Sequence, residues 1–194
     1  MPGLEMTRID TEKAVKAVRQ LLEALGVDLD EEGVRETPER VAKMLEEVLS
    51  GYQEEVEPVT FTETADLVVM AGIPFVSLCE HHLLPFIGFA HIAYKPRGRV
   101  LGASKLVRVV RKYAHRLQLQ ERLTRQVLEE VVKLAGTADV MVITEAVHTC
   151  MVARGVRTAS PLIVLRASGA FASDERLVDR VLALIAPYRL RRPL

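Results

Sequence analysis

The sequence predicts an α+β fold in which a helical arm precedes a single domain of helices packed on an antiparallel sheet. Residues 11–51 carry two amphipathic segments with the period of a helix, whereas the apolar pattern becomes strand-like from Asp66 onward. The later strands come in pairs rather than in βαβ alternation, which favours an antiparallel sheet. We therefore expect an arm and linker at residues 1–60 and a domain at residues 61–194.

The arm is predicted to contain two helices. The first spans residues 11–25, where apolar side chains recur on one side, and Gly26 follows as a stop signal. The second begins at Thr37-Pro38, because threonine suits the N-cap and proline suits the first turn, and it ends near Gly51. Residues 52–65 have the composition of a connector.

The domain is predicted to contain pairs of strands separated by a pair of helices. Strands are expected at 67–70 and 75–78, with Gly72 and Pro74 between them as a bulge or turn, and at 86–94 before a turn at 95–98. Two helices follow at 104–117 and 121–135. The last elements are strands at 140–152 and 159–171 and a helix at 174–186 that Ser173 caps.

Composition narrows the class of protein. The chain has 194 residues, 49% of them hydrophobic, which is ample for a core. Its 26 basic and 26 acidic residues cancel, and this argues against a general nucleic-acid surface. No apolar run reaches the roughly 18 residues of a membrane-spanning helix. Residues Met1–Asp10 lack the apolar core of a signal peptide, so we expect a cytoplasmic protein with reduced thiols.

Two short segments, Cys79-Glu80-His81-His82 and His148-Thr149-Cys150, hold both cysteines and three of the five histidines. Cys79-x-x-His82 is a metal-ligand spacing, and two thiolates with one imidazole suit Zn²⁺. Three protein ligands would leave one position for water, as in catalytic zinc sites. His81 and His148 would then lie beside the metal, where an imidazole can transfer protons near pH 7.

Other readings of these segments stay open at this point. The two cysteines could form a disulfide, or they could be inert buried thiols, but neither reading explains the flanking histidines. His81 could be the ligand in place of His82, because spacing alone does not separate them. We take the remaining histidines, His91 and His115, as structural.

The helix predicted at 104–117 has a basic side without acidic partners on the same helix. This side is either a solvated surface or an anion site, and Ser104 with Lys105 at the helix start would suit a phosphate. Glu121 opens the next predicted helix. An acidic residue there ordinarily complements the helix dipole, but it could also accept hydrogen bonds from paired N–H donors of a base.

Five motifs in this order resemble the GTP cyclohydrolase I family. They cover residues 37 to 155 and are specific in combination, although each alone would be weak. The motifs are Thr37-Pro38-x-Arg40-Val41-Ala42-Lys43-Met44, Cys79-Glu80-His81-His82, Gly102-x-Ser104-Lys105 with Arg108, Gln118-x-Gln120-Glu121-Arg122-Leu123-Thr124, and His148-x-Cys150-Met151-x-Ala153-Arg154-Gly155.

The resemblance implies conversion of GTP and water to 7,8-dihydroneopterin triphosphate and formate, the first step of pterin and folate synthesis. It implies zinc bound by Cys79, His82 and Cys150, and an acid/base pair formed by His81 and His148. Guanine would be bound by Gln120 and Glu121. The triphosphate would be bound by Arg40, Lys43, Ser104, Lys105, Arg108 and Arg154.

The resemblance also implies a tunnelling fold, in which the sheets of several subunits join into a barrel. Members of the family assemble as homodecamers of two pentamers, with active sites between subunits.

Two other functions compete with this one. A deazaguanine nitrile reductase shares the tunnelling fold but needs a cysteine nucleophile and a nicotinamide, whereas both cysteines here are placed as metal ligands. A structural zinc module would unfold or dissociate without metal, whereas a catalytic site would leave a folded but inactive protein.

Overall fold

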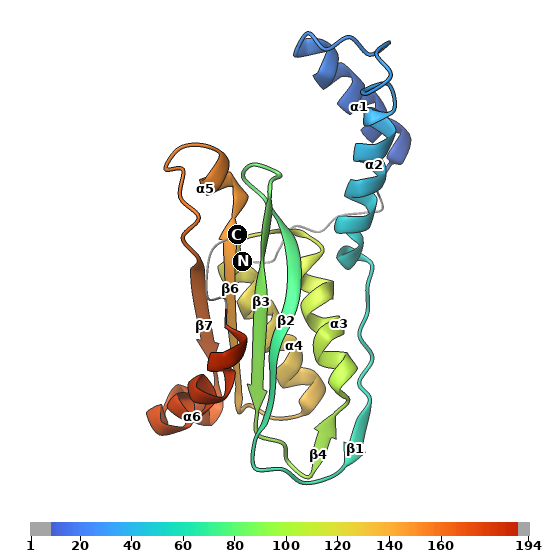
Figure 1. The fold of residues 1–194 in the computed structure, drawn as a ribbon. Helices are drawn as coiled ribbons and strands as arrows, with labels where there is room; N and C mark the ends of the chain where they lie inside the picture. Colours follow the sequence, from blue (N-terminus) through green and yellow to red (C-terminus); the bar gives the residue numbers. More distant parts are fainter. Residues whose placement is uncertain (1–8, 190–194) are drawn as a thin grey trace.

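The computed structural model (Figure 1) describes residues 9–189. The expectation about Met1–Asp10 therefore falls almost wholly outside the described residues. The arm consists of α1 (Thr11–Ala24) and α2 (Thr37–Val48), and it extends away from the sheet. Asp10 caps α1 by accepting the backbone N–H of Lys13, and Pro38 lies in the first turn of α2. Both predicted arm helices are confirmed, and the short 3₁₀ helix η1 (Ser50–Tyr52) follows the second.

The domain is built on a five-stranded sheet in the order β5-β2-β3-β6-β7. Its long strands are β2 (Val68–Cys79), β3 (Pro85–Tyr94), β6 (Val140–His148) and β7 (Leu162–Ala167), and each pairs antiparallel with its neighbour. The two-residue β5 (Leu117–Gln118) adds parallel to the end of β2. A separate ribbon pairs β1 (Thr60–Thr62) with β4 (Arg99–Leu101). The predicted α+β architecture with an antiparallel sheet is confirmed.

Helices cover the two faces of this sheet unequally (Figure 1). On one face, α3 (Ala103–Ala114) and α4 (Gln120–Ala135) bury the larger core, which includes Phe75, Phe86 and Leu123. On the other face, α6 (Glu175–Ile185) covers a smaller core around Met141 and Phe171. The arrangement leaves part of the second face open in a single chain.

Three predicted boundaries in the sheet and in α3 differ from the structure. The strands predicted at 67–70 and 75–78 form one strand, in which Gly72 occupies a bulge with a φ of 69° that favours glycine. The strand predicted at 140–152 ends at His148, and the short helix α5 (Thr149–Ala153) follows it. The helix predicted at 104–117 ends at Ala114, because Leu117 pairs with β2 instead.

The predicted N-cap of the last helix is wrong by one residue. Asp174, not Ser173, caps α6, because its carboxylate accepts the backbone N–H of Leu177 at 3.2 Å. The strand predicted at 159–171 is confined to β7, and the 3₁₀ helix η2 (Gly169–Ala172) occupies its predicted end. A further 3₁₀ helix, η3 (Ala186–Tyr188), follows α6. Within residues 9–189, no helix combines the length and the apolar composition needed to cross a membrane.

The register of the sheet brings the two cysteine-histidine segments to the same end. Leu78 pairs with Pro85, and Phe86 pairs with His148, so β2 and β6 both finish beside the start of β3. Cys79 also pairs with Gln118 of β5, which places the start of α4 at this end of the sheet. Three segments that are far apart in the sequence therefore meet there.

Candidate metal and substrate site

Two cysteines and one histidine form a compact group at the shared end of β2 and β6. The possible ligand atoms of Cys79, His148 and Cys150 all lie within 4.8 Å of one another. Both cysteines are free thiols, and Cys79 is buried. Burial and then the neighbouring Cys79 raise the pKa of the Cys150 thiol, and a bound cation would reverse this effect. Two sulfurs and one imidazole nitrogen are a donor set that fits zinc.

The other two histidines of the motif lie on the exposed side of Cys79. His81 Nδ1 and His82 Nδ1 are each 3.9 Å from Cys79 Sγ. His82 Nε2 lies 2.8 Å from the guanidinium of Arg154. The structure thus brings together two of the three predicted ligands, Cys79 and Cys150, and groups them with His148, whereas His82 contacts Cys79 from outside this group.

His148 is held on two sides. Its ring stacks on Phe86, with centroids 4.6 Å apart and planes 1° apart. Its Nε2 lies 2.9 Å from Oε1 of Gln120, the first residue of α4. Burial lowers the pKa of His148, while the nearby carboxylate of Glu121 acts in the opposite direction. The ring is therefore fixed in place and disposed to be neutral.

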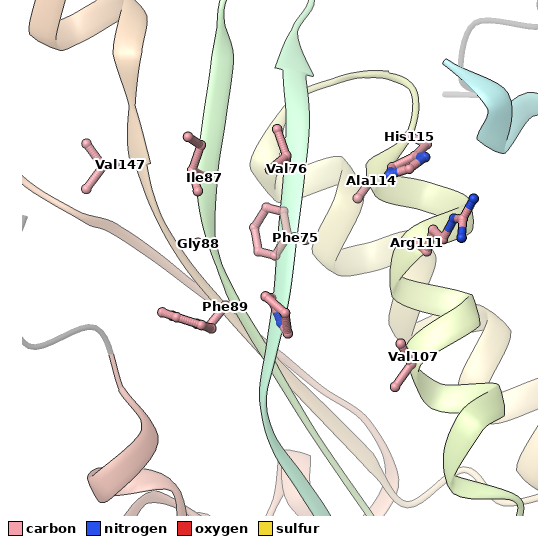
Figure 2. Close-up of a pocket in the computed structure, with 11 residues that line it drawn as sticks. Phe75, Val76, Ile87, Gly88, Phe89, Val107, Arg111, Ala114, His115 and Val147 are labelled. Carbon is pink, nitrogen blue, oxygen red and sulfur yellow. The ribbon is translucent and has the colours of Figure 1, made fainter. Parts of the chain in front are cut away.

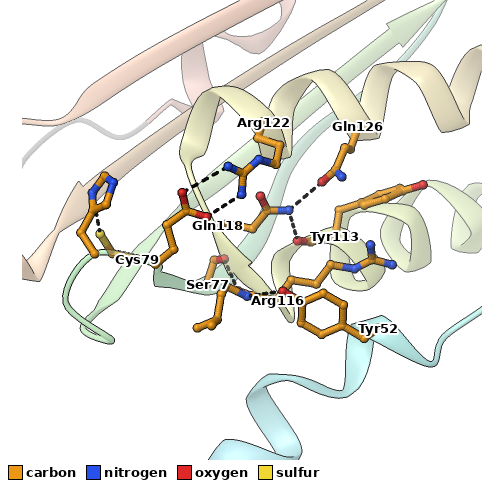
Figure 3. A network of polar contacts seen from close by, with 11 residues as sticks. Tyr52, Ser77, Cys79, Tyr113, Arg116, Gln118, Arg122 and Gln126 are labelled. Carbon is orange, nitrogen blue, oxygen red and sulfur yellow. Dashed lines mark hydrogen bonds and ion pairs between the residues drawn. The ribbon is translucent and has the colours of Figure 1, made fainter. Parts of the chain in front are cut away.

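An ion pair joins the metal-ligand loop to α4 (Figure 3). The guanidinium of Arg122 donates to both carboxylate oxygens of Glu80, at 2.5 and 3.1 Å, and each side chain is about one-fifth exposed. The hydrogen bond from Arg122 lowers the pKa of Glu80. Sequence reasoning missed this pair, because no spacing rule relates residues that are 42 positions apart.

The predicted substrate residues divide into three places. Gln120, Glu121 and Arg154 lie at the metal end of the sheet. Arg40 and Lys43 are exposed on α2, where Arg40 pairs with Glu36.

The third place is the first half of α3, which carries Ser104, Lys105 and Arg108 and follows the β4 strand. Leu101 there donates its backbone N–H to the hydroxyl of Tyr94, at the end of β3 opposite Cys79. α3 then runs back along the sheet, because its last residue, Ala114, is soon followed by Leu117, which pairs with Leu78 next to Cys79. A helix of this length spans about 17 Å. Ser104 and Lys105 therefore lie at the end of α3 that is away from the cysteines, and Arg108 lies about half-way along the helix.

The basic side of α3 has more acidic partners than the sequence indicated. Lys112 contacts Glu130 at 3.0 Å, and Arg111 contacts Glu54 at 3.3 Å. These carboxylates come from α4 and from the connector, which a reading of α3 alone does not include. Among the described residues, Lys105 and Arg108 form no ion pair, so the first two turns of the helix keep unpaired positive charge.

An apolar pocket lies apart from the predicted metal and substrate residues, between the open sheet face and α3 (Figure 2). Val76, Ile87 and Phe89 line it from β2 and β3, and Val107 lines it from α3. Val76 is 43% exposed in the single chain. None of the predicted metal or substrate residues belongs to this pocket.

Comparison with known proteins agrees with this geometry. The family model for GTP cyclohydrolase I matches residues 14–186. The chain belongs to the GTP cyclohydrolase I family. It is 56% identical over 184 residues to the GTP cyclohydrolase 1 of Hyperthermus butylicus, covering 95% of each chain.

Two further relatives named GTP cyclohydrolase 1 support this assignment. The protein of Caldivirga maquilingensis is 51% identical, covering 91% of this chain and 94% of the relative. The protein of Caldanaerobacter subterraneus is 46% identical, covering 93% of this chain and all of the relative. The chain is thus an enzyme, a hydrolase of the type that acts on cyclic amidines, and its curled sheet with packed helices is the predicted tunnelling fold.

Proposed function

We propose that this enzyme converts GTP and water to 7,8-dihydroneopterin triphosphate and formate with the help of zinc, at the start of pterin and folate synthesis. One observation carries the proposal: Cys79, His148 and Cys150 converge within 4.8 Å in a chain that matches the family over residues 14–186. We keep the ligand set Cys79, His82 and Cys150 that the family implies; His82 Nδ1 lies 3.9 Å from Cys79 Sγ, at the same distance as His81 Nδ1. Zinc, when bound, would lower the pKa of a water molecule to about 7.

His81 would supply the first proton. Guanine C8 is a poor electrophile while the ring is neutral, and a proton delivered to N7 allows water to add at C8. The imidazole ring of the base then opens and loses formate. His81 is exposed at the rim of the cysteine group, where it can reach a bound base.

His148 would transfer protons in the later steps. The ribose must open and rearrange before its carbon closes onto the free amine, and this needs a second acid/base group near the sugar. His148 meets the requirement because burial lowers its pKa and favours the neutral ring that can accept a proton. We place the guanine at the start of α4, where Gln120 and Glu121 lie beside His148.

The triphosphate would be bound by several cations that orient the far end of the substrate. In one chain these cations are not together. Arg154 lies at the metal end, whereas Ser104, Lys105 and Arg108 lie in the first half of α3 and Arg40 and Lys43 lie on the arm. This separation supports active sites composed by neighbouring subunits.

Assembly is also supported by the edge strand β7. Its consecutive residues Leu162 and Ile163 are 38% and 47% exposed, and Leu165 is 44% exposed. Apolar residues on both faces of an edge strand are typical of a strand that is covered in an oligomer. We propose that subunit sheets join here into a barrel, and that residues 1–60 form the arm of a homodecamer of two pentamers.

We also propose that the enzyme is cytoplasmic, because both cysteines are free thiols.

The test is to measure zinc content and formate release from GTP on the same preparation. Removal of the metal should leave a folded, inactive protein, and zinc should restore the activity. Unfolding on metal removal would favour a structural zinc module instead. Consumption of a reduced nicotinamide without formate release would favour a nitrile reductase.

The two histidines should stop the reaction at different stages. His81→Ala should stall before C8 is attacked, whereas His148→Ala should accumulate a ring-opened or formylated species that mass spectrometry detects. Formation of the normal product by either variant would remove that histidine from its assigned role.

A further inference from the structure

We propose that Gln120 is a positioning residue, whose side-chain amide holds His148 with a proton on Nε2 and leaves Nδ1 free for the chemistry of the site. The proposal rests on the proposed function only for the use of His148. The orientation of the two side chains follows from contacts within the chain.

The amide nitrogen of Gln120 is surrounded by acceptors. Its Nε2 lies 3.1 Å from the backbone oxygen of Thr144, 3.1 Å from the hydroxyl of Thr144 and 3.0 Å from the backbone oxygen of Leu162. Backbone carbonyls only accept hydrogen bonds, so the side of the amide that faces them must be the NH₂ group. The opposite side, which faces His148, is therefore the carbonyl oxygen.

The hydroxyl groups beside the amide agree with this direction. Thr124 Oγ1 donates to the backbone oxygen of Gln120 at 2.7 Å and lies 2.7 Å from Thr144 Oγ1. Because the single hydroxyl proton of Thr124 goes to Gln120, the proton of Thr144 must go to Thr124. Thr144 Oγ1 is then an acceptor for the amide of Gln120.

The burial of this network makes the alternative orientation costly. Gln120, Thr124 and Thr144 are each at most 1% exposed. A flipped amide would point its oxygen at two carbonyl oxygens, and it could donate at most one of its two hydrogens, to an unprotonated His148 Nε2. Gln120 Oε1 is therefore held toward His148.

This fixes the proton on the histidine. Gln120 Oε1 lies 2.9 Å from His148 Nε2 and can only accept, so Nε2 must carry the hydrogen. The parallel stack on Phe86 fixes the plane of the ring. Nδ1 is left as the nitrogen that can take a proton from substrate or bind a cation.

The same contacts leave Gln120 little capacity to read the base. Its two amide hydrogens serve Thr144 and Leu162, and its oxygen serves His148. Direct recognition of guanine then falls to Glu121, while Gln120 acts on turnover through the imidazole.

The test compares Gln120→Met with Gln118→Met in the zinc-loaded enzyme. Gln118 is a matched control: it is also 1% exposed, and its amide donates to Tyr113 and Gln126 rather than to His148 (Figure 3). Gln120→Met should lower kcat by about 10- to 100-fold, as loss of an outer hydrogen-bond partner typically does. Its KM for GTP and its preference for GTP over inosine triphosphate should stay close to wild type, and Gln118→Met should keep kcat.

A raised KM together with a lost preference for GTP over inosine triphosphate would instead show that Gln120 reads the base. The tautomer is measured independently by ¹⁵N NMR of histidine-labelled enzyme without GTP, with His148→Asn to assign the signal. The proposal requires that His148 carries its hydrogen on Nε2 in the wild type. In Gln120→Met, the hydrogen should no longer be held on Nε2 alone. Hydrogen on Nδ1 alone in the wild type would overturn the proposal. This outcome does not depend on whether the enzyme catalyses the proposed GTP reaction.

If Gln120→Met fails to fold, Thr144→Val provides the second variant. It removes one acceptor from the amide and keeps Gln120 itself, so it should lower kcat by a smaller factor without changing base preference. An unchanged kcat together with an unchanged NMR tautomer in Thr144→Val would contradict the role of the network.

Discussion

Cys150 is the second residue of the short helix α5, where its sulfur lies near Cys79 from a distant part of the chain. Replacement by serine removes a thiolate, and a hydroxyl is a poor zinc ligand at neutral pH. We expect Cys150→Ser to lose most bound zinc and activity, measured as metal content and formate release. The control is Met151→Leu on the same helix. Stoichiometric zinc and full activity in Cys150→Ser would contradict the ligand assignment.

Glu121 should determine which base is accepted. Guanine presents N1–H and a 2-amino group together, and one carboxylate can accept both hydrogen bonds, whereas adenine lacks this pair of donors. Sites that depend on such donors can reject analogues by roughly 10⁴-fold. Glu121 is exposed at the start of α4, so it is available to a ligand. Glu121→Ala should lose most GTP turnover and keep zinc, and Glu121→Gln should keep part of it.

The measurement for Glu121 is a comparison of GTP and ATP binding in the wild type and in Glu121→Ala. A preference for GTP that survives the substitution unchanged would reduce Glu121 to a charge that complements the helix dipole. Guanine would then be read elsewhere in the site.

At the scale of elements, the Glu80–Arg122 pair ties the loop after β2 to α4. The loop carries Cys79, His81 and His82, and α4 carries Gln120 and Glu121, so the pair sets the distance between candidate metal and base sites. We expect Glu80→Gln and Arg122→Gln each to weaken zinc retention and turnover. A double-mutant cycle on unfolding should give a coupling of about 1 kcal/mol. The matched control is Arg125→Gln with Glu129→Gln, an exposed pair on α4.

If the double variant loses as much unfolding free energy as the Glu80 and Arg122 single variants together, the two side chains do not act as a pair. An Arg122→Lys variant adds a second criterion. Lysine keeps the charge but not the two parallel hydrogen bonds, so it should recover only part of the coupling.

The stability of the fold should depend on pH through His91, which contacts the bulge in β2. Gly72 donates its backbone N–H to His91 Nδ1 at 3.1 Å, and His91 Nε2 lies 2.9 Å from Glu145, which Arg189 also approaches at 3.6 Å. Burial lowers the pKa of His91 below its usual 6.5, although Glu145 opposes the shift. The unfolded chain therefore takes up the proton first. The stabilisation that neutral His91 contributes is complete above about pH 6.5. It falls as the pH drops toward the pKa of His91 in the folded protein, by up to about 1.4 kcal/mol per pH unit.

The control for His91 is His91→Gln, whose amide can accept from Gly72 and donate to Glu145 without titrating in this range. Thermal midpoints of both proteins at pH 7.5 and pH 5.5 give the answer. The wild type should lose more stability than His91→Gln over this interval. Equal losses would mean that His91 takes up no proton on unfolding.

The sequence was sufficient where a local rule fixes the structure. The apolar period predicted both arm helices. The concentration of cysteines and histidines in two segments indicated a metal site, and the structure groups Cys79, His148 and Cys150. It was insufficient where long-range contacts decide. Leu117 left the predicted helix because β2 offered a pairing partner, and the amide of Gln120 took its direction from Thr144 and Leu162, which no local pattern relates to it.

At the scale of the whole molecule, the separation of the two ends of the sheet has a direct consequence. The cysteines lie at the end of β2, whereas Lys105 and Arg108 lie in the first half of α3, which begins near the other end of β3. We therefore expect that the two sets of residues serving one GTP come from different subunits. Head-to-tail joining of sheets, with β7 of one chain beside the next, would supply such a contact.

Subunit mixing tests this consequence. Cys150→Ser lacks a metal ligand and Lys105→Ala lacks a phosphate contact, so each homo-oligomer should have low activity. In oligomers assembled from equal amounts of both, about a quarter of the subunit contacts would join an intact metal end to an intact α3 start. Formate release should therefore rise toward one quarter of the wild-type value, whereas unmixed samples combined without subunit exchange should not recover. No gain in verified mixed oligomers would place the metal and phosphate residues of each site on one chain.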